Sequence, residues 1–292
     1  MIHYEGTLFR PPSEADSLIL QATIGCSYNE CAFCGMYREK RFRVRKLDEL
    51  AREIEWAAEH APFVRKVFLA DGDALIAKTA FLEAVLDKLA ASFENLARVS
   101  CYASPQSLQV RSETEMERLA EKGLSLYYLG IESGHDEVLA KLTKGVDAAE
   151  MVRVANKAQD AGVKLSTMIL LGAGGRALSA EHARASARVV NEIQPRFVST
   201  LVMTPVEGTP LFDADRRGEF DHLDELELTA ELREFVAGLD LRASIFRSNH
   251  ASNRLQLAGT LSKDKPALLA KLDRALSDPA HAPFVPRWLR GL

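Results

Sequence analysis

The chain has 292 residues, of which 47% are hydrophobic and 27% are charged, and its formal net charge is −4. This length suits one large α/β domain, or such a domain with a small extension. The slightly acidic balance gives no electrostatic signal for nucleic acid, and no apolar run approaches the roughly 20 residues of a membrane helix. Residues 1–6 do not resemble an export signal, so we expect a cytoplasmic protein without membrane contact.

Strand-like and helix-like patterns alternate along most of the chain. The predicted strands cover residues 17–25, 67–70, 98–103, 126–131, 164–171 and 197–202. The predicted helices cover residues 47–57, 81–89, 112–123, 147–162 and 179–192. Six successive strand–helix units with short connections predict a parallel sheet with helices outside, curled into a barrel or an open partial barrel. In such barrels the chemistry lies at the carboxyl ends of the strands.

This pattern divides the chain into three regions. Residues 1–16 form an N-terminal segment, residues 17–212 form the partial barrel, and residues 213–292 form a helical and irregular extension that we expect to cover the barrel. Within the barrel, Ser112 and Glu115 have the spacing of a capping box and predict a helix start.

Three of the four cysteines follow the first strand, with the spacing CX4CX2C at Cys26, Cys31 and Cys34. Three thiolates on one short loop can hold an iron–sulfur cube and leave one iron open for chemistry. Zinc would need a fourth ligand, and no histidine or further cysteine lies nearby. Cys31 and Cys34 alone could be a redox pair, but that leaves Cys26 unexplained. Cys101, on the third predicted strand, is interpreted as a buried free thiol.

The cysteine loop resembles the signature of the radical S-adenosylmethionine (radical SAM) superfamily. It has one residue more in its first interval than the commonest family spacing, CX3CX2C. The resemblance implies an α/β fold, a partial (β/α)6 TIM-like barrel, and a [4Fe–4S] cluster that cleaves SAM reductively. It also implies that Phe33 packs near the adenine of SAM. The following motifs are similar to those of oxygen-independent coproporphyrinogen oxidase, tRNA methylthiotransferases and the elongator catalytic subunit.

Polar motifs follow the second and fourth strands. Asp71, Gly72 and Asp73 look like a shortened form of the family turn that receives the SAM amino group, although Asp-Gly is also common in ordinary turns. Glu132 and Lys144 match two positions that face SAM in the family. Lys144 has an alternative interpretation, as a cation that complements the end of a helix.

Glycines follow the fifth strand, and a serine follows the third. Gly172 opens a glycine-rich turn whose main chain is expected, from the resemblance, to contact the adenine. A tight strand–helix connection also needs glycine, so this signal is weak by itself. Ser104 and Ser166 are suggested ribose contacts, because the family's usual polar groups are missing near those positions.

Residues 246–253 crowd polar side chains together without helical or strand periodicity. The ordinary interpretation is a surface turn. The functional interpretation is a loop that closes the barrel mouth, in which Arg247, Asn249, His250 and Asn253 contact the substrate, and Arg247 and His250 orient it. A guanidinium at such a place favours a carboxylate or phosphate on the substrate.

The sequence therefore predicts a radical SAM enzyme, an oxidoreductase or transferase, that acts on a small or medium organic substrate, most simply an anionic one. An electron donor such as flavodoxin or ferredoxin is the implied partner. The alternatives are an RNA- or peptide-modifying radical SAM enzyme and a non-catalytic metal-binding protein.

Overall fold

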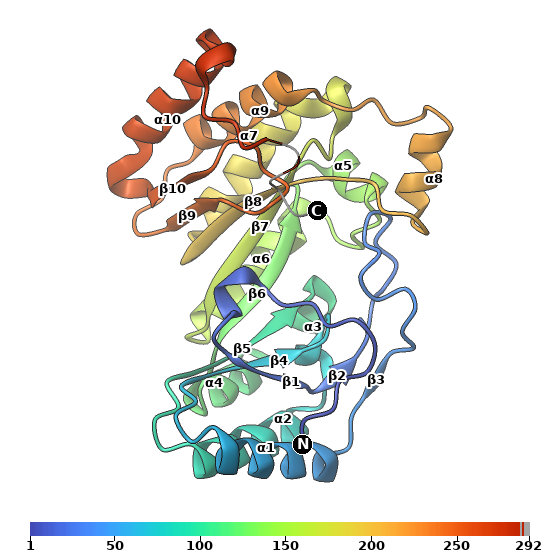
Figure 1. Cartoon of the computed structure of the whole chain (residues 1–292), viewed down its shortest axis with the longest axis vertical. Helices are drawn as coiled ribbons and strands as arrows, with labels where there is room; N and C mark the ends of the chain where they lie inside the picture. Colours follow the sequence, from blue (N-terminus) through green and yellow to red (C-terminus); the bar gives the residue numbers. More distant parts are fainter. Residues whose placement is uncertain (287, 289–292) are drawn as a thin grey trace. The chain divides into compact units, whose positions relative to one another are not determined.

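The computed structural model describes residues 1–286 and residue 288. It has a mixed α/β fold with a mostly parallel eight-stranded sheet and a separate two-stranded sheet (Figure 1). The strands are β1 (Leu18–Gln21), β2 (Thr23–Ile24), β3 (Arg43–Val44), β4 (Lys66–Ala70), β5 (Arg98–Ala103), β6 (Leu124–Glu132), β7 (Lys164–Leu171), β8 (Phe197–Val202), β9 (Ile245–Ser248) and β10 (Leu257–Thr260).

A helix follows each of the longer strands, and further helices lie elsewhere in the chain. They are α1 (Leu47–His60), α2 (Thr79–Ser92), α3 (Pro105–Val110), α4 (Glu113–Glu121), α5 (Asp136–Lys141), α6 (Ala148–Asp160), α7 (Gly175–Ile193), α8 (Pro210–Arg216), α9 (Glu225–Gly238) and α10 (Leu261–Ser277). None of the helices in the described part of the chain is both long and apolar enough to cross a membrane. The described residues group into two compact units.

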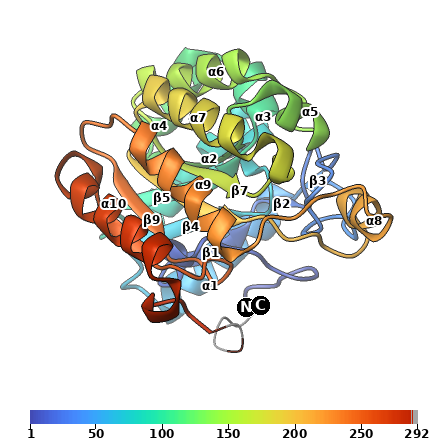
Figure 2. The ribbon, with the colours of Figure 1, turned by 90° about the horizontal axis from the view of Figure 1, so that it is seen from above.

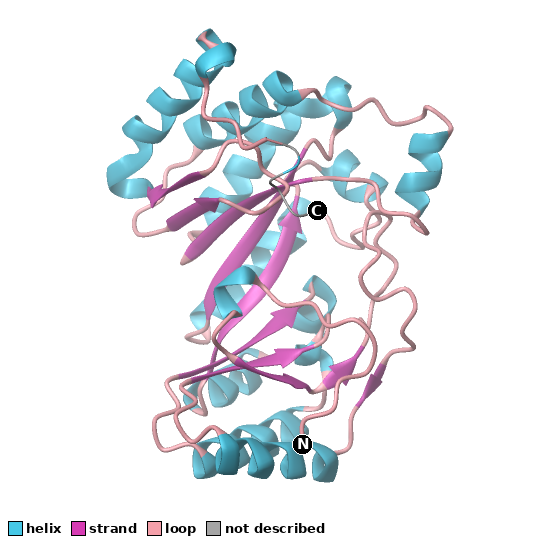
Figure 3. Ribbon diagram, viewed as in Figure 1, coloured by secondary structure: helices cyan, strands magenta, loops and turns pink. Residues whose placement is uncertain are grey.

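The first unit comprises residues 1–29, 36–129 and 154–165. Its strands β1, β4, β5 and the first part of β6 lie side by side and parallel, as Figure 3 shows. Residues 67–70 of β4 are fully buried on both faces of the sheet. Continuous apolar strands of this kind are expected in parallel sheets that are covered on both sides.

The second unit comprises residues 30–35, 130–153 and 166–292. Strand β8 pairs in parallel with β7 and β9, and β10 closes the edge antiparallel to β9. Helices α7, α9 and α10 lie next to one another over this part of the sheet (Figures 1 and 2). The buried side chains of β8, such as Val198 and Thr200, alternate with partly exposed ones, such as Ser199 and Leu201.

The six predicted strands are confirmed, although residues 17–25 divide into β1 and β2. The capping box of α4 forms as predicted, since the Ser112 and Glu115 side chains accept each other's backbone N–H groups. Two predictions are wrong. The helix expected from residue 179 begins at Gly175, and the polar segment 246–253 begins as a regular strand, β9, which extends the sheet.

Candidate functional site

The cysteine loop begins in the first unit, where β2 ends at Gly25. Gly25 has a φ of +77°, a conformation that favours glycine. The next residue, Cys26, is half-buried and in no disulfide. A Cβ on Gly72 would lie 2.9 Å from the Cys26 Cβ and 2.5 Å from the Tyr37 ring, so a larger residue would displace the cysteine. Gly72 therefore gives Cys26 the space that its position needs.

Cys31 and Cys34 belong to the second unit and are also half-buried and in no disulfide. Ala32, one of the two residues between them, is anchored at both backbone groups. Its N–H donates to the carbonyl of Leu142 (2.9 Å), and its carbonyl accepts from the N–H of Leu211 (2.9 Å). The loop is thereby fixed to the segments that follow β6 and β8.

Lys144 lies close to these two cysteines. Its ammonium is buried and forms an ion pair with Glu132 at 3.0 Å. Burial alone would lower the pKa of Lys144, but the carboxylate of Glu132 and the negative charges of Cys31 and Cys34 as thiolates raise it above its usual value. Glu132 and Lys144, predicted as SAM contacts, are thus brought together beside two of the three cysteines.

Gly130 makes this ion pair possible, and sequence reasoning missed it. A Cβ at Gly130 would lie 1.9 Å from Oε1 of Glu132 and 3.2 Å from Nζ of Lys144. Glu132 itself has a φ of +67°, which is uncommon for a residue other than glycine. The signal in the sequence was a glycine inside an otherwise bulky strand, which often marks a close approach.

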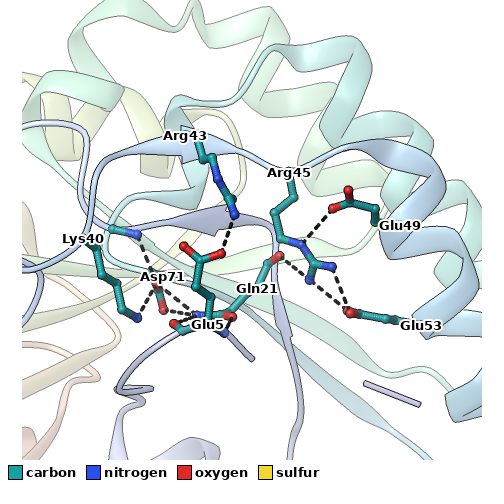
Figure 4. Close-up of polar contacts among 9 residues, drawn as sticks. Glu5, Gln21, Lys40, Arg43, Arg45, Glu49, Glu53 and Asp71 are labelled. Carbon is teal, nitrogen blue, oxygen red and sulfur yellow. Dashed lines mark hydrogen bonds and ion pairs between the residues drawn. The ribbon is translucent and has the colours of Figure 1, made fainter. Parts of the chain in front are cut away.

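Asp71 is fully buried at the end of β4, and protein groups already bind its carboxylate (Figure 4). Its Oδ2 accepts from Nζ of Lys40 (2.9 Å) and from the N–H of Gly25 (3.1 Å), and Gln21 donates to both oxygens. Asp71 therefore supports the start of the cysteine loop. Its contact with SAM remains a prediction.

Asp73 and Ser104, both predicted to contact SAM, lie together in the first unit. Oδ2 of Asp73 accepts from the hydroxyl of Ser104 (2.7 Å) and from that of Ser27 (2.5 Å), beside Cys26. Burial raises the pKa of Asp73, although these hydrogen bonds oppose the rise. The described residues give this carboxylate no ion pair, so a cationic ligand would stabilise its charge.

The glycine turn after β7 is held by a residue that sequence reasoning missed. Gly172 has a φ of +80°, and its N–H donates to Oε1 of Glu231 on α9 (2.6 Å). The next residue, Ala173, belongs to an apolar cluster against which Phe33 packs. The two segments expected near the adenine, Phe33 and the Gly172 turn, are therefore neighbours in the second unit.

The four predicted substrate residues lie on β9 and the loop after it. Arg247 is exposed and pairs in register with Ser199 of β8. Asn249 is exposed, whereas burial lowers the pKa of the half-buried His250, whose Nδ1 accepts from the N–H of Ser252 (3.1 Å). The loop runs along the end of β8, because Ser252 Oγ accepts from the N–H of Val202 at 2.9 Å.

Asn253 lines a cavity of about 680 Å³ at the carboxyl ends of β7 and β8. Its Nδ2 donates to the carbonyl of Thr200 (2.6 Å). The cavity wall is mostly apolar and includes Leu171, Val202, Leu223, Leu226, Leu228, Leu232 and Leu255.

Cys101, the cysteine outside the loop, is fully buried on β5, and burial raises the pKa of its thiol.

Comparison with known proteins identifies the family. The model of the radical SAM superfamily matches residues 20–176, more than half of the chain. The chain belongs to the radical SAM superfamily. It is therefore an enzyme of the radical SAM class, a class that uses a [4Fe–4S] cluster and SAM. Cys26, Cys31 and Cys34 are half-buried and in no disulfide, and Gly72 leaves space beside Cys26. Among the described residues, no three histidine, cysteine or acidic side chains are grouped closely enough to hold a metal ion.

Individual relatives are distant. An uncharacterized protein of Methanocaldococcus jannaschii is 22% identical over 149 residues, which are 51% of this radical SAM chain and 46% of that protein. A tRNA uridine(34) acetyltransferase of Methanocaldococcus infernus is 25% identical over 117 residues, 40% of this chain and 22% of the enzyme. The chain thus spans less than half the length of these relatives.

Solved structures show the same fold. The coproporphyrinogen III oxidase of Escherichia coli, a radical SAM enzyme, superposes with a TM-score of 0.56 at 17% identity. The superposition covers 76% of this chain and 51% of the oxidase. The shared architecture is the partial TIM-like barrel expected from the sequence, and β9 and β10 extend its sheet.

Proposed function

We propose that Cys26, Cys31 and Cys34 hold a [4Fe–4S] cluster with which the enzyme cleaves SAM reductively and begins radical chemistry on a small or medium organic substrate. The observation that carries the proposal is the buried ion pair of Lys144 and Glu132 at 3.0 Å, in the same unit as Cys31 and Cys34. The open iron would bind SAM and supply the electron. A cation at this place would bind the SAM carboxylate through a charge-assisted hydrogen bond.

The remaining cofactor contacts follow from the arrangement within each unit. The buried carboxylate of Asp73, with Ser104 beside it, would accept from the SAM amino group and the ribose. Gly72 would allow close main-chain approach, with Asp71 fixing the turn. Phe33 and the Gly172 turn would enclose the adenine.

Iron content tests the ligand set. After anaerobic reconstitution, Cys31→Ala should lose the cluster, with its absorption near roughly 400 nm, whereas Cys101→Ala should keep both. A full cluster in Cys31→Ala, or its loss in Cys101→Ala, would contradict the assignment. Cys101 is a matched control because it is a free cysteine outside the loop.

The proposed substrate is an organic anion held by residues of β9 and its loop. Arg247 is exposed and lies in register with Ser199 and, beyond it, Met168, on the less buried face of β7 and β8. A guanidinium there would bind a carboxylate or phosphate with two hydrogen bonds. Asn249, His250 and Asn253 would then orient the rest of the molecule.

A metabolite-extract screen tests this proposal. The wild type should consume an anionic compound in a SAM-dependent way, and Arg247→Ala should fail to consume it while still cleaving SAM. Consumption of a compound without any anionic group would contradict the assignment. We propose flavodoxin or ferredoxin as the electron donor and the cytoplasm as the location.

A second candidate function is RNA modification, favoured by the match to the tRNA acetyltransferase. The net charge of −4 argues against it, because RNA binding draws mainly on basic surfaces. Total tRNA in a filter-binding assay separates the two functions. Tight, salt-dependent binding would favour RNA, and its absence favours the small molecule.

A further inference from the structure

A buried carboxylate on α9 binds the main chain at the end of β7. Glu231 is 2% exposed, and its Oε1 accepts from the N–H of Gly172 at 2.6 Å. Its Oε2 accepts from the hydroxyl of Ser179 on α7 at 2.5 Å. One side chain from the region after residue 213 thus holds a turn of the barrel region.

His182 on α7 extends this contact to a second turn. Its Nε2 lies 3.7 Å from Oε1 of Glu231 and 3.0 Å from the carbonyl of Leu170. Its Nδ1 lies 2.8 Å from Oγ of Ser133, which in turn accepts from the N–H of His135. The turns that follow β6 and β7 are therefore connected through Glu231 and His182, all within the second unit.

Burying Glu231 and His182 costs desolvation free energy. Burial raises the pKa of Glu231 to about 7 and lowers that of His182 to about 4, so neither charge is well stabilised. The nearby Arg176 is engaged by Glu227 and Asp221. A leucine at position 231 would avoid the desolvation cost but would leave the Gly172 N–H without its acceptor.

We propose that Glu231 is a positioning residue for SAM, which fixes the Gly172 turn in the conformation that receives the adenine. This proposal rests on the function proposed above. The turn adjoins the apolar cluster that includes Ala173 and against which Phe33 packs. Because Gly172 has a left-handed backbone conformation, the turn has few alternatives that preserve its path, and the hydrogen bond from Glu231 selects one of them.

Ligand binding to the reconstituted, oxidised enzyme tests the proposal without turnover. The ligands for calorimetry are SAM, 5′-deoxyadenosine and methionine. Glu231→Ala should raise the Kd of SAM and of 5′-deoxyadenosine at least tenfold and leave the Kd of methionine unchanged. Glu231→Gln keeps an acceptor for the Gly172 N–H and should stay within about threefold of the wild type. Glu234→Ala, on the same helix but partly exposed, is the matched control.

Hydrogen exchange provides a second readout. The amide of Gly172 should exchange faster in Glu231→Ala than in the wild type, and Glu231→Gln should restore its protection. Where Glu231→Ala does not fold, Glu231→Asp serves instead, since its shorter side chain withdraws the carboxylate from Gly172.

The outcomes separate this proposal from the one on which it rests. A wild type that binds none of the three ligands refutes the proposed function. A wild type that binds SAM, with equal affinity in Glu231→Ala, overturns the positioning role alone. Equal weakening for methionine and 5′-deoxyadenosine also overturns it, because that result indicates general damage.

Discussion

The Glu231→Gln substitution should change how the stability of this protein depends on pH. The carboxyl group is buried, and its pKa is about 7 in the folded chain against 4.5 for an ordinary glutamate. Between these two pH values the folded state binds more protons than the unfolded state. The contribution of this carboxyl group to the free energy of unfolding is therefore fully present below pH 4.5. It is lost as the pH rises towards and through 7. Glutamine does not titrate, so the variant lacks this loss.

The size of the effect follows from the two pKa values. Their difference corresponds to roughly 3 kcal/mol over the whole range, and about 2 kcal/mol of it falls between pH 5 and pH 7.5. The wild type should therefore lose about 2 kcal/mol relative to Glu231→Gln over that interval. His182, whose pKa burial lowers from 6.5 to about 4, is present in both proteins, so its contribution largely cancels.

Urea unfolding at pH 5 and pH 7.5, followed by tryptophan fluorescence, measures the difference when both proteins are in the same cofactor state. Glu234→Gln is the control, and its difference from the wild type should not depend on pH in this way. A Glu231→Gln difference that is equal at the two pH values would refute the reasoning. So would a difference that changes in the opposite direction.

Three further substitutions test the site and the fold. Lys144→Ala should raise the Kd of SAM at least tenfold with the iron content unchanged, because it removes the cation proposed to bind the SAM carboxylate and leaves Glu132 buried without its partner. Lys141→Ala, on the exposed face of α5, should change neither the Kd nor the iron content. Gly130→Ala should weaken SAM binding similarly, because its Cβ would displace Glu132; unchanged affinity would show that the ion pair is dispensable. Ser112→Ala should cost about 1 kcal/mol in urea unfolding through loss of the α4 cap, and no loss would mean that another group caps the helix.

Local signals made much of the fold predictable. The capping box at Ser112 and Glu115 spans four consecutive positions, and residues 67–70 of β4 and 168–171 of β7 are unbroken apolar runs, so both signals could be interpreted without knowledge of distant contacts. Strand β9 was missed because its partner, β8, lies far back in the sequence, and the polar Arg247 and Ser248 interrupt the apolar pattern.

The candidate site was predictable where a motif carried it, and less so elsewhere. The spacing of Cys26, Cys31 and Cys34 alone predicts them as ligands of an iron–sulfur cluster. Glu231 was not predicted, because its hydrogen-bond partner, Gly172, is distant in the sequence. A signal was present, however: Glu231 lies on α9 at helical spacing from Leu228 and Phe235, on the apolar face of the helix. A carboxylate at such a place is buried and needs a donor.

The carboxylate of Asp71 has a consequence for how the cysteine loop is prepared for metal. It binds Gly25, just before Cys26, and Lys40, beyond Cys34, so both ends of the cysteine segment are held at one point. Such a clasp acts as a non-covalent cross-link and reduces the conformational entropy that the segment would lose when iron binds. The affinity of the loop for the proposed cluster would thus be set partly by a residue that donates nothing to iron.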